Sequence, residues 1–388
     1  MITPMRVFAI FTLFISFGLL KEAKKSTRPA SFADFSAAFH CIWVATAIFY
    51  HDGFAKALES GGVYFVEFWP MYVFGRYIGS SPVRLRKVAK SLLLTVIILT
   101  PFAYIEAFTG FSLSKLINNV MGGGGETLVT EPRLGLNRAA ATFPHPILYG
   151  LFCSTMLGIF AFTFRGPRFK WLLLGLITVF PSLSSAPLLS VVLQGGIIMW
   201  SIFFKGVRDK WPILVGLILL MATLVHLLSN RDVITVIMYY LSFNPGTGYW
   251  RMLIWEYGLI EVLDSPVFGI GFADWRRPAF MVSPSVDSFW LLTAMRFGLP
   301  SIVSVLAILI YTSYRMYNGR FGILSDHVVG WATAMLGIFF VGVTVHFWAS
   351  SFVLLAVMIG VGVSLSSFKA SYIHNLKVER TMKTVEVV

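Results

Sequence analysis

Residues 211–228 read WPILVGLILLMATLVHLL, an apolar run without Asp, Glu, Lys or Arg. A helix of this length rises about 27 Å, close to the roughly 30 Å hydrocarbon core of a bilayer. Similar runs recur along the 388 residues, of which 57% are hydrophobic and 13% charged. A soluble globular domain has about 25% charged residues, so most of this chain must have lipid as its solvent. We therefore expect an all-α, polytopic integral membrane protein with a single membrane domain over 1–388.

The apolar runs predict about eleven transmembrane helices. Two long connections, 108–143 and 229–287, are predicted to be extracytoplasmic loops, and 368–388 a cytoplasmic tail. Pro181 and Pro187 indicate a broken pair where the sixth and seventh spans meet. The predicted spans lie near 5–20, 32–50, 62–79, 89–107, 144–164, 171–184, 187–204, 211–228, 288–312, 327–346 and 348–367.

Lysine and arginine fall mainly in alternate connections between these spans. Of the 31 basic residues, 21 lie there, in short loops and in the C-terminal tail, and Arg76 is one of them. Cytoplasmic loops are enriched in Lys and Arg, so the N-terminus is predicted to be outside and the C-terminus cytoplasmic. The net charge of +13 is then a topology signal, and it does not indicate nucleic acid as a partner.

The remaining basic residues are predicted to be external, and they are mostly arginine. Eight are Arg and two are Lys, whereas the cytoplasmic set has ten Arg and eleven Lys. A guanidinium group can grip phosphate or carboxylate through two parallel hydrogen bonds, which an ammonium group cannot. The alternative is that these residues are solvated loop charges and snorkelling anchors. The set comprises Arg6, Lys56, Lys115, Arg133, Arg138, Arg231, Arg251, Arg276, Arg277 and Arg296.

The first external loop ends in a segment with several candidate residues. Its glycine run, 122–125, indicates a hinge; a phosphate cradle is the alternative, but the Lys-Ser/Thr of a nucleotide loop is absent. Arg133 and Arg138 follow, before Phe143-Pro144-His145-Pro146, a proline-marked helix start. His145 is either a general base or a structural histidine at the interface.

The second external loop contains a helical pattern over 251–263. Arg251 and Trp255, spaced i and i+4, share a face of that helix, which suits a charged headgroup against an aromatic wall. Trp275, Arg276 and Arg277 form an aromatic and cationic cluster further on. Trp250, Trp255 and Trp275 are candidates for stacking on sugar rings. The alternative for each Trp is the aromatic belt at the membrane interface.

Asp287 stands where this loop returns to the membrane, directly before Ser288. A carboxylate at the entry to an apolar helix is costly unless it is paired or used, so Asp287 is the candidate general base, tuned by desolvation and nearby Arg in opposite directions. The alternative is a helix N-cap, a position that Asp favours. Cys41 and Cys153 lie in apolar runs without metal-ligand spacing, which indicates buried thiols.

Three segments resemble the O-antigen ligase and polymerase superfamily of bacterial envelope glycosyltransferases. They are GYWRMLIWEYGLIEVLDSPVFGIGFADW (248–275), VDSFWLLTAMRFGLPS (286–301) and RLGLNRAAATFPHPILYG (133–150). In that family an Arg opens a helix ending in D-x-P-x-x-G-x-G, and a polar residue starts a span that ends in a glycine-leucine-proline/glycine turn. The matching positions here are Arg251, Asp264, Pro266, Gly269, Gly271, Asp287, Gly298, Leu299 and Pro300.

The resemblance implies a GT-C-like arrangement of helices in the bacterial inner membrane, with membrane lipid around it. The implied substrate is an undecaprenyl diphosphate-linked oligosaccharide, and a chain-length regulator is an implied partner. Arg138, Arg251 and Asp287 would be catalytic. No nucleotide or metal motif is present, and no cofactor is expected. The substrate-binding residues would be Arg133, Arg276, Arg277, His145, Trp255 and Trp275.

Two departures from the family pattern favour polymerase over ligase. Ligases of this superfamily have a His at the entry to the late span, where this chain has Asp287-Ser288, and a Ser-Arg pair in a middle span, where it has 184–187. Other hypotheses are a lipid flippase or polysaccharide transporter, for which the Pro181–Pro187 break would serve, and a non-catalytic envelope-assembly protein. Against transport, no internal repeat is found and the unusual charges collect in the external loops.

Overall fold

The computed structural model describes residues 4–29, 31–113, 131–207, 209–228, 245–319, 321, 324–369 and 372. Within these ranges all regular structure is helical, and β-type pairing is limited to isolated bridges. The predicted all-α class is confirmed for this part of the chain. The glycine run 122–125 and most of the predicted tail 368–388 lie outside the described residues.

The apolar runs of the sequence form most of the helices, and proline or glycine marks many of their ends. In chain order the helices are α1 (Pro4–Ser26), α2 (Ser31–Lys56), η1 (Ala57–Gly61), α3 (Gly62–Gly79), α4 (Pro82–Thr109), α6 (Pro146–Thr163), α7 (Arg168–Val179), η2 (Phe180–Ser182), α8 (Ser185–Phe203), α9 (Lys210–Leu228), α11 (Pro245–Asp264), α12 (Phe289–Phe297), α13 (Leu299–Asn318), α14 (Ser325–Gly342) and α15 (Ser350–Leu365).

Seven helical stretches of the described chain are long and apolar enough to span a membrane. They are the continuous stretch Phe32–Gly79, α4, α6, α8, α9, α13 and α14. The predicted spans near 5–20, 171–184 and 348–367 form α1, α7 and α15, which do not meet the same criteria of length and apolarity. The single span predicted over 288–312 is wrong, because Gly298 divides it into α12 and α13. The total of about eleven spans stays a prediction.

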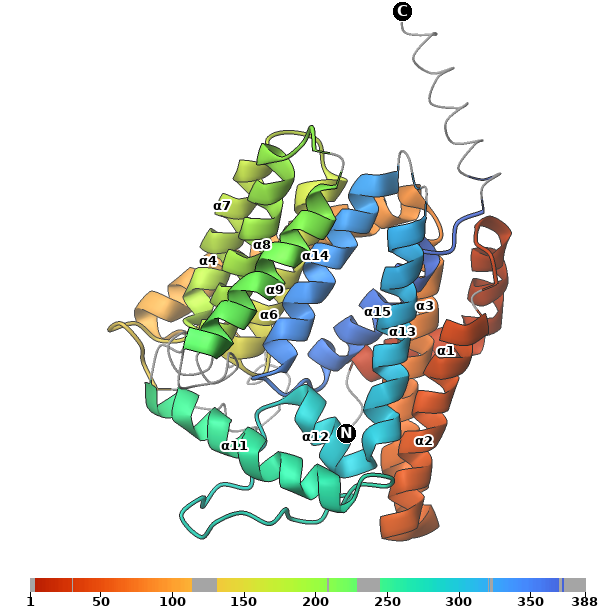
Figure 1. Ribbon diagram of the computed structural model, residues 1–388, viewed down its shortest axis with the longest axis vertical. Coiled ribbons are helices and arrows are strands. Elements are labelled where there is room, and N and C mark those ends of the chain that lie inside the picture. Colours follow the sequence, from red (N-terminus) through yellow and green to blue (C-terminus); the bar gives the residue numbers. More distant parts are fainter. Residues whose placement is uncertain are drawn as a thin grey trace, which may run out of the picture.

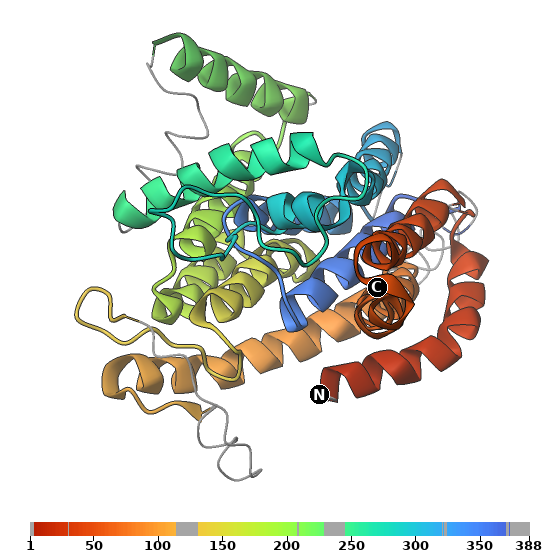
Figure 2. The same cartoon turned by 90° about the horizontal axis from the view of Figure 1, so that it is seen from below.

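The bundle has two different ends (Figure 1). α11 crosses one end, and Figure 2, which views that end, shows residues 131–145 and the chain after α11 there as well. The connections after α3, α6 and α8 lie at the opposite end, with Arg84, Arg86, Arg165, Arg168 and Lys205 in or next to them. We call these the α11 end and the basic end. The long segments predicted to carry the functional residues therefore share one end of the molecule.

The centre of the bundle is the pair α3 and α15, packed along their length. Arg76 on α3 is fully buried there, so it is not the solvated topology charge that the sequence indicated. Its Nε lies 3.6 Å from Oδ1 of Asp34, which also accepts a hydrogen bond of 2.7 Å from the Tyr72 hydroxyl. The three guanidinium nitrogens of Arg76 have no hydrogen-bond partner among the described residues, so Asp34 compensates the charge of Arg76 without a hydrogen bond.

Two smaller predictions concern the apolar parts of the chain. Cys41 and Cys153 are buried free thiols, as expected. α9, which contains the apolar run 211–228, has no buried residue among those described. It stands apart from the other helices in Figure 2. Its side chains therefore face the surrounding medium, which for an apolar helix means lipid.

Candidate functional site

The segment 131–145 is held in place by a tight turn. Arg133 and Leu136 exchange two backbone hydrogen bonds of 2.9 and 3.0 Å around Leu134 and Gly135. Both central residues have positive φ, 54° and 74°, which is the geometry of a two-residue type I′ turn. This turn presents the Arg133 side chain at a fixed place beside the helix bundle.

The same segment is anchored to α4 by a buried carboxylate. Oε2 of Glu106 accepts hydrogen bonds from the backbone N–H groups of Ala140, at 3.1 Å, and Ala141, at 2.7 Å. The N–H of Ala139 donates to the carbonyl of Pro181, at 2.9 Å. Because buried backbone donors need acceptors, these contacts determine the path of the chain before α6.

Two arginines donate hydrogen bonds to the interruption between α7 and α8. The break predicted at Pro181 is confirmed: η2 ends α7, and Leu183 then takes a positive φ of 44°. The freed carbonyl of Leu183 accepts from Nη1 of Arg133 at 2.9 Å, and the Ser184 hydroxyl accepts from Nη2 of Arg138, also at 2.9 Å. The broken helix thus orients both guanidinium groups.

Arg251 comes to the same place from α11. Burial, followed by the positive charges of Arg133 and Arg251, lowers the pKa of Arg138 to about 10. Burial also lowers the pKa of Arg251; Asp287 opposes this effect and Arg133 adds to it. Charges act on one another in this way only at short range. We call Arg133, Arg138 and Arg251 the arginine cluster; its carboxylate neighbours are Asp287, near Arg251, and Glu131, near Arg133.

The arginine cluster is not neutralised by direct ion pairs. None of its three guanidinium groups forms an ion pair with a carboxylate of the described part of the chain. The Nε atoms of Arg138 and Arg251 are buried and have no hydrogen-bond partner within that part. A buried charged donor without an acceptor is costly, and a bound anion would satisfy both.

Asp287 does not cap a helix. The cap of α12 is Ser288, whose Oγ accepts from the N–H of Leu291 at 3.3 Å and donates to the carbonyl of Gly342 at 3.2 Å. The N-cap interpretation of Asp287 is therefore wrong by one residue. The side chain of Asp287 is exposed, contrary to the expected desolvation, and accepts a hydrogen bond of 2.9 Å from the Ser285 hydroxyl. Its carboxylate remains accessible to a ligand.

His145 has a defined tautomer. It is the N-cap of α6, where its Nδ1 accepts a hydrogen bond of 3.1 Å from the N–H of Ile147. In a neutral imidazole the proton then resides on Nε2, which is a donor. Burial and the charge of Arg138, opposed by Asp287, lower the pKa of His145 to about 4, so the ring is neutral near pH 7. This arrangement supports the structural role and leaves no acceptor nitrogen for general-base catalysis.

The arginines that follow α11 differ from the arginine cluster. Arg276 pairs with Glu261 and Asp264, and hydrogen bonding to Glu261 is the largest cause that raises its pKa. Arg277 pairs with Asp274 and donates from Nε to the carbonyl of Met281 at 2.8 Å. We call these two the paired arginines. Their charges are already compensated by the protein itself.

Trp275 and Trp255, which the resemblance gives as substrate-binding residues, are held by hydrogen bonds to backbone carbonyls. Trp275 is only 5% exposed and donates from Nε1 to the carbonyl of Pro284 at 3.0 Å. Trp255 is half-buried, and its Nε1 donates to the carbonyl of Val343 at 2.9 Å. Both indoles fasten the α11 region to its surroundings. Trp250, earlier in α11, is exposed instead.

The family-like motifs after α11 and after α12 bind one another. The N–H groups of Ile270 and Gly271 donate to the carbonyls of Met295 and Arg296, at 2.7 and 3.0 Å. The N–H of Leu299 donates back to the carbonyl of Pro266, at 2.7 Å. Gly269 and Gly298 have positive φ, and a Cβ at either would overlap the partner's backbone. These glycines therefore serve as a clamp that positions α11 against α12.

Sequence reasoning missed two site residues, Glu106 and Ser184. An acidic residue near the end of an apolar span is a signal that would have found Glu106. Ser184 lies in the break that proline predicts, but its arginine partner is 46 residues away.

No group of three or more His, Cys, Asp or Glu side chains in the described ranges is arranged to hold a metal ion. No protein-family model matches the chain, and no curated protein is significantly similar to it.

Proposed function

We propose that this protein transfers glycosyl groups from a lipid diphosphate-linked oligosaccharide and so polymerises repeat units into an exopolysaccharide or O-antigen. The single observation that carries the proposal is the arginine cluster, three guanidinium groups without a direct carboxylate partner among the described residues, beside the exposed carboxylate of Asp287. Arg251 is buried and Arg133 and Arg138 are half-buried, and a diphosphate would supply the anion that their charges lack.

The proposed reaction is a displacement at the anomeric carbon of the donor sugar. A hydroxyl oxygen of the acceptor glycan forms the new C–O bond while the bond to the diphosphate oxygen breaks, and the electron pair leaves with the diphosphate. Arg138 and Arg251 stabilise the negative charge that grows on this leaving group. Asp287 takes the proton of the acceptor hydroxyl. His145 donates from Nε2 to the bound diphosphate as a neutral group.

The position of the cluster suits a substrate anchored in the membrane. It lies at the α11 end, where the segment 131–145, α11 and the chain after α11 are found. In the proposed topology this end faces outward from the bacterial inner membrane, because the basic end faces the cytoplasm. The lipid tail would then stay in the bilayer while the diphosphate reaches the arginines.

The break between α7 and α8 favours this proposal over transport. A transporter uses a broken helix near the bilayer midplane to bind its cargo. Here the freed carbonyl of Leu183 accepts a hydrogen bond from Arg133, and the hydroxyl of Ser184 accepts one from Arg138. Its polar groups are therefore used to orient the arginine cluster.

The test uses purified full-length protein with undecaprenyl diphosphate-linked oligosaccharides extracted from its own host after deletion of the gene. Growth of a ladder on the lipid carrier is the expected result. Transfer to a different acceptor would make the protein a ligase, and movement of lipid across vesicles without bond formation would make it a transporter. Asp287→Asn should abolish ladder growth at normal protein level, and normal growth in that variant would contradict the assignment of the base.

A further inference from the structure

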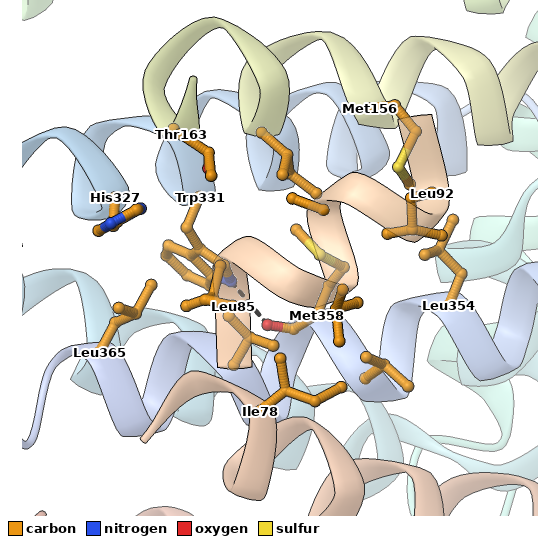
Figure 3. A pocket seen from close by; sticks show the side chains of 16 residues that line it. Ile78, Leu85, Leu92, Met156, Thr163, His327, Trp331, Leu354, Met358 and Leu365 are labelled. Atoms are coloured by element: carbon orange, nitrogen blue, oxygen red, sulfur yellow. Dashed lines mark hydrogen bonds between the residues drawn. The ribbon is translucent and has the colours of Figure 1, made fainter. Parts of the chain in front are cut away.

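A cavity lies between α4, α6, α14 and α15 (Figure 3). Its free volume is about 60 Å³, several times the roughly 10–15 Å³ that one water needs. The walls are almost wholly apolar, with Leu85 and Ala89 from α4, Trp331 from α14 and Met358 from α15. A dry cavity of this kind binds hydrocarbon in preference to water.

The cavity follows the helix axes for about half of a membrane. Its lining on α15 extends from Leu354 to Leu365, a separation of 11 residues, or about 16 Å. The hydrocarbon core of a bilayer is about 30 Å thick, so the cavity matches one leaflet. It is placed toward the basic end, because Leu85 lies near the start of α4 and Leu365 ends α15. A hydrocarbon chain from a single leaflet fits this length.

One end of the cavity carries an unsatisfied polar atom. His327 is only 9% exposed, lines the cavity at this end, and its Nδ1 is buried without a partner among the described residues. Nε1 of Trp331, the other ring nitrogen there, already donates to the carbonyl of Met358. Arg86, which is exposed, and Asp326 act on His327 with opposite signs, and Asp326 pairs with Arg168 at 3.1 Å. The end of the cavity therefore offers one buried ring nitrogen beside two arginines and one carboxylate, with positive charge in excess.

We propose that this cavity is a binding site for an anionic phospholipid of the leaflet at the basic end. One acyl chain occupies the apolar cavity, and the phosphate lies against His327 and Arg86. The polyprenyl chain of the proposed substrate is much longer than a cavity that spans one leaflet, and the arginine cluster lies at the opposite end. The site therefore serves a lipid different from the substrate and does not depend on the proposed reaction.

The experiment measures lipid retained by the full-length protein after purification in mild detergent, by native mass spectrometry with identification of the released lipid. Wild type is expected to keep one phospholipid per chain, enriched in anionic headgroups. Ala89→Phe places a ring in the cavity and should lower retention by about tenfold. Leu94→Phe adds a similar ring on the exposed side of α4, where Leu94 is 58% exposed, and should keep the lipid.

His327→Leu separates the headgroup from the chain. It keeps the apolar wall, so lipid is still retained, but the excess of anionic over zwitterionic lipid should fall severalfold. Quenching of tryptophan fluorescence by brominated phosphatidylglycerol in vesicles gives a second readout, with Trp331→Phe to isolate the cavity. Absence of retained lipid from wild type, equal retention by Ala89→Phe, or recovery of a polyprenyl phosphate as the bound lipid would each overturn the proposal. The last result would assign the cavity to the substrate tail.

Discussion

The arginine cluster and the paired arginines lie in the same region of the molecule, at the α11 end, but their charges are treated differently. Arg276 and Arg277 each meet a carboxylate within a few residues of chain or on the adjacent α11. Arg133, Arg138 and Arg251 meet a carbonyl, a hydroxyl and one another. The charges of the paired arginines are neutralised within the protein, whereas the arginine cluster keeps positive charge that a bound anion can neutralise.

This difference teaches how to separate scaffold from site within one set of residues of the same type. A guanidinium group that forms an ion pair with a carboxylate is already neutralised and needs no ligand. Burial without it leaves a cost in the free protein that only a bound anion removes. Variants of the arginine cluster and variants of the paired arginines should therefore differ in activity and in stability.

The largest effect is expected from Arg251→Met. Loss of one preorganised group that stabilises a leaving anion lowers kcat by about 100- to 1,000-fold. The matched control, Arg276→Met, removes an exposed paired arginine and should lower kcat much less. Initial rates of ladder growth on lipid-linked oligosaccharide measure both variants. Equal losses in the two would remove the distinction.

The same two variants should diverge in the opposite direction in stability. Arg251→Met removes a buried charge without a direct partner, so the midpoint of thermal unfolding in detergent should stay the same or rise. Arg276→Met leaves the buried Glu261 carboxylate without its side-chain partner, so that midpoint should fall. A fall in Tm for Arg251→Met comparable to that of Arg276→Met would show that Arg251 is a scaffold residue.

Glu106→Ala tests whether the arginine cluster depends on its anchor. The N–H groups of Ala140 and Ala141 lose their acceptor, at a cost of about 1–3 kcal/mol of unfolding free energy for a buried donor. Because this contact positions the segment with Arg133 and Arg138, transferase activity should fall roughly tenfold. Glu59→Ala, on an exposed residue paired with Lys56, is the control and should change neither quantity.

His145 offers two substitutions with opposite predictions. His145→Asn keeps a good N-cap but loses the Nε2 donor, so activity should fall about tenfold with stability retained. His145→Gln keeps a long amide donor but is a poor cap, so stability should fall by about 1 kcal/mol with more activity left. The reverse pattern would mean that His145 acts through the helix start alone.

A smaller effect is expected in the pH dependence of stability. The pKa of His145 is about 4 in the folded chain and 6.5 when the group is exposed, so the unfolded state binds more protons between these values. Wild-type stability should therefore decline as pH falls from 6.5 toward 4. His145→Asn should decline less over that window, as measured by thermal unfolding. Identical profiles would contradict the burial of a neutral imidazole.

The smallest effect is predicted for Asp274→Asn. Asp274 is exposed, and Arg277 keeps its hydrogen bond to the carbonyl of Met281. Exposed ion pairs contribute little, so activity and Tm should both stay close to wild type. A large loss of activity would place the paired arginines in the site after all.

Helix ends that carry a local sequence signal could be predicted. Contacts in the site that join distant parts of the chain could not. Pro181 predicted a break, and the structure has one. The division at Gly298 had a local signal too, because Gly298 and Pro300 are both helix breakers, but the length and apolarity of 288–312 were given more weight. The pairing that fixes the division, with the turn at 266–271, lies about 30 residues earlier and is not visible in the sequence. The apolar run alone therefore read as a single span.

The candidate site follows the same rule. The excess of arginine in the segments predicted to be external did not separate Arg251 from Arg276, because compensation depends on which carboxylate folds nearby. The choice between base and cap at Asp287 turned on one residue of register, and Ser288 takes the cap. Such a difference is smaller than the uncertainty of any helix boundary drawn from composition.

The way α11 and α12 are fastened has a consequence for biosynthesis. Trp255 and the N–H of Phe289 both bind carbonyls of 343–345, which leave the ribosome some 55 to 90 residues after them. Arg133 and Arg138 likewise wait for residues 183 and 184. A nascent chain that has inserted its early helices therefore has no assembled centre. The contacts that fasten α11 and α12 therefore form only after residues 343–345 have been made.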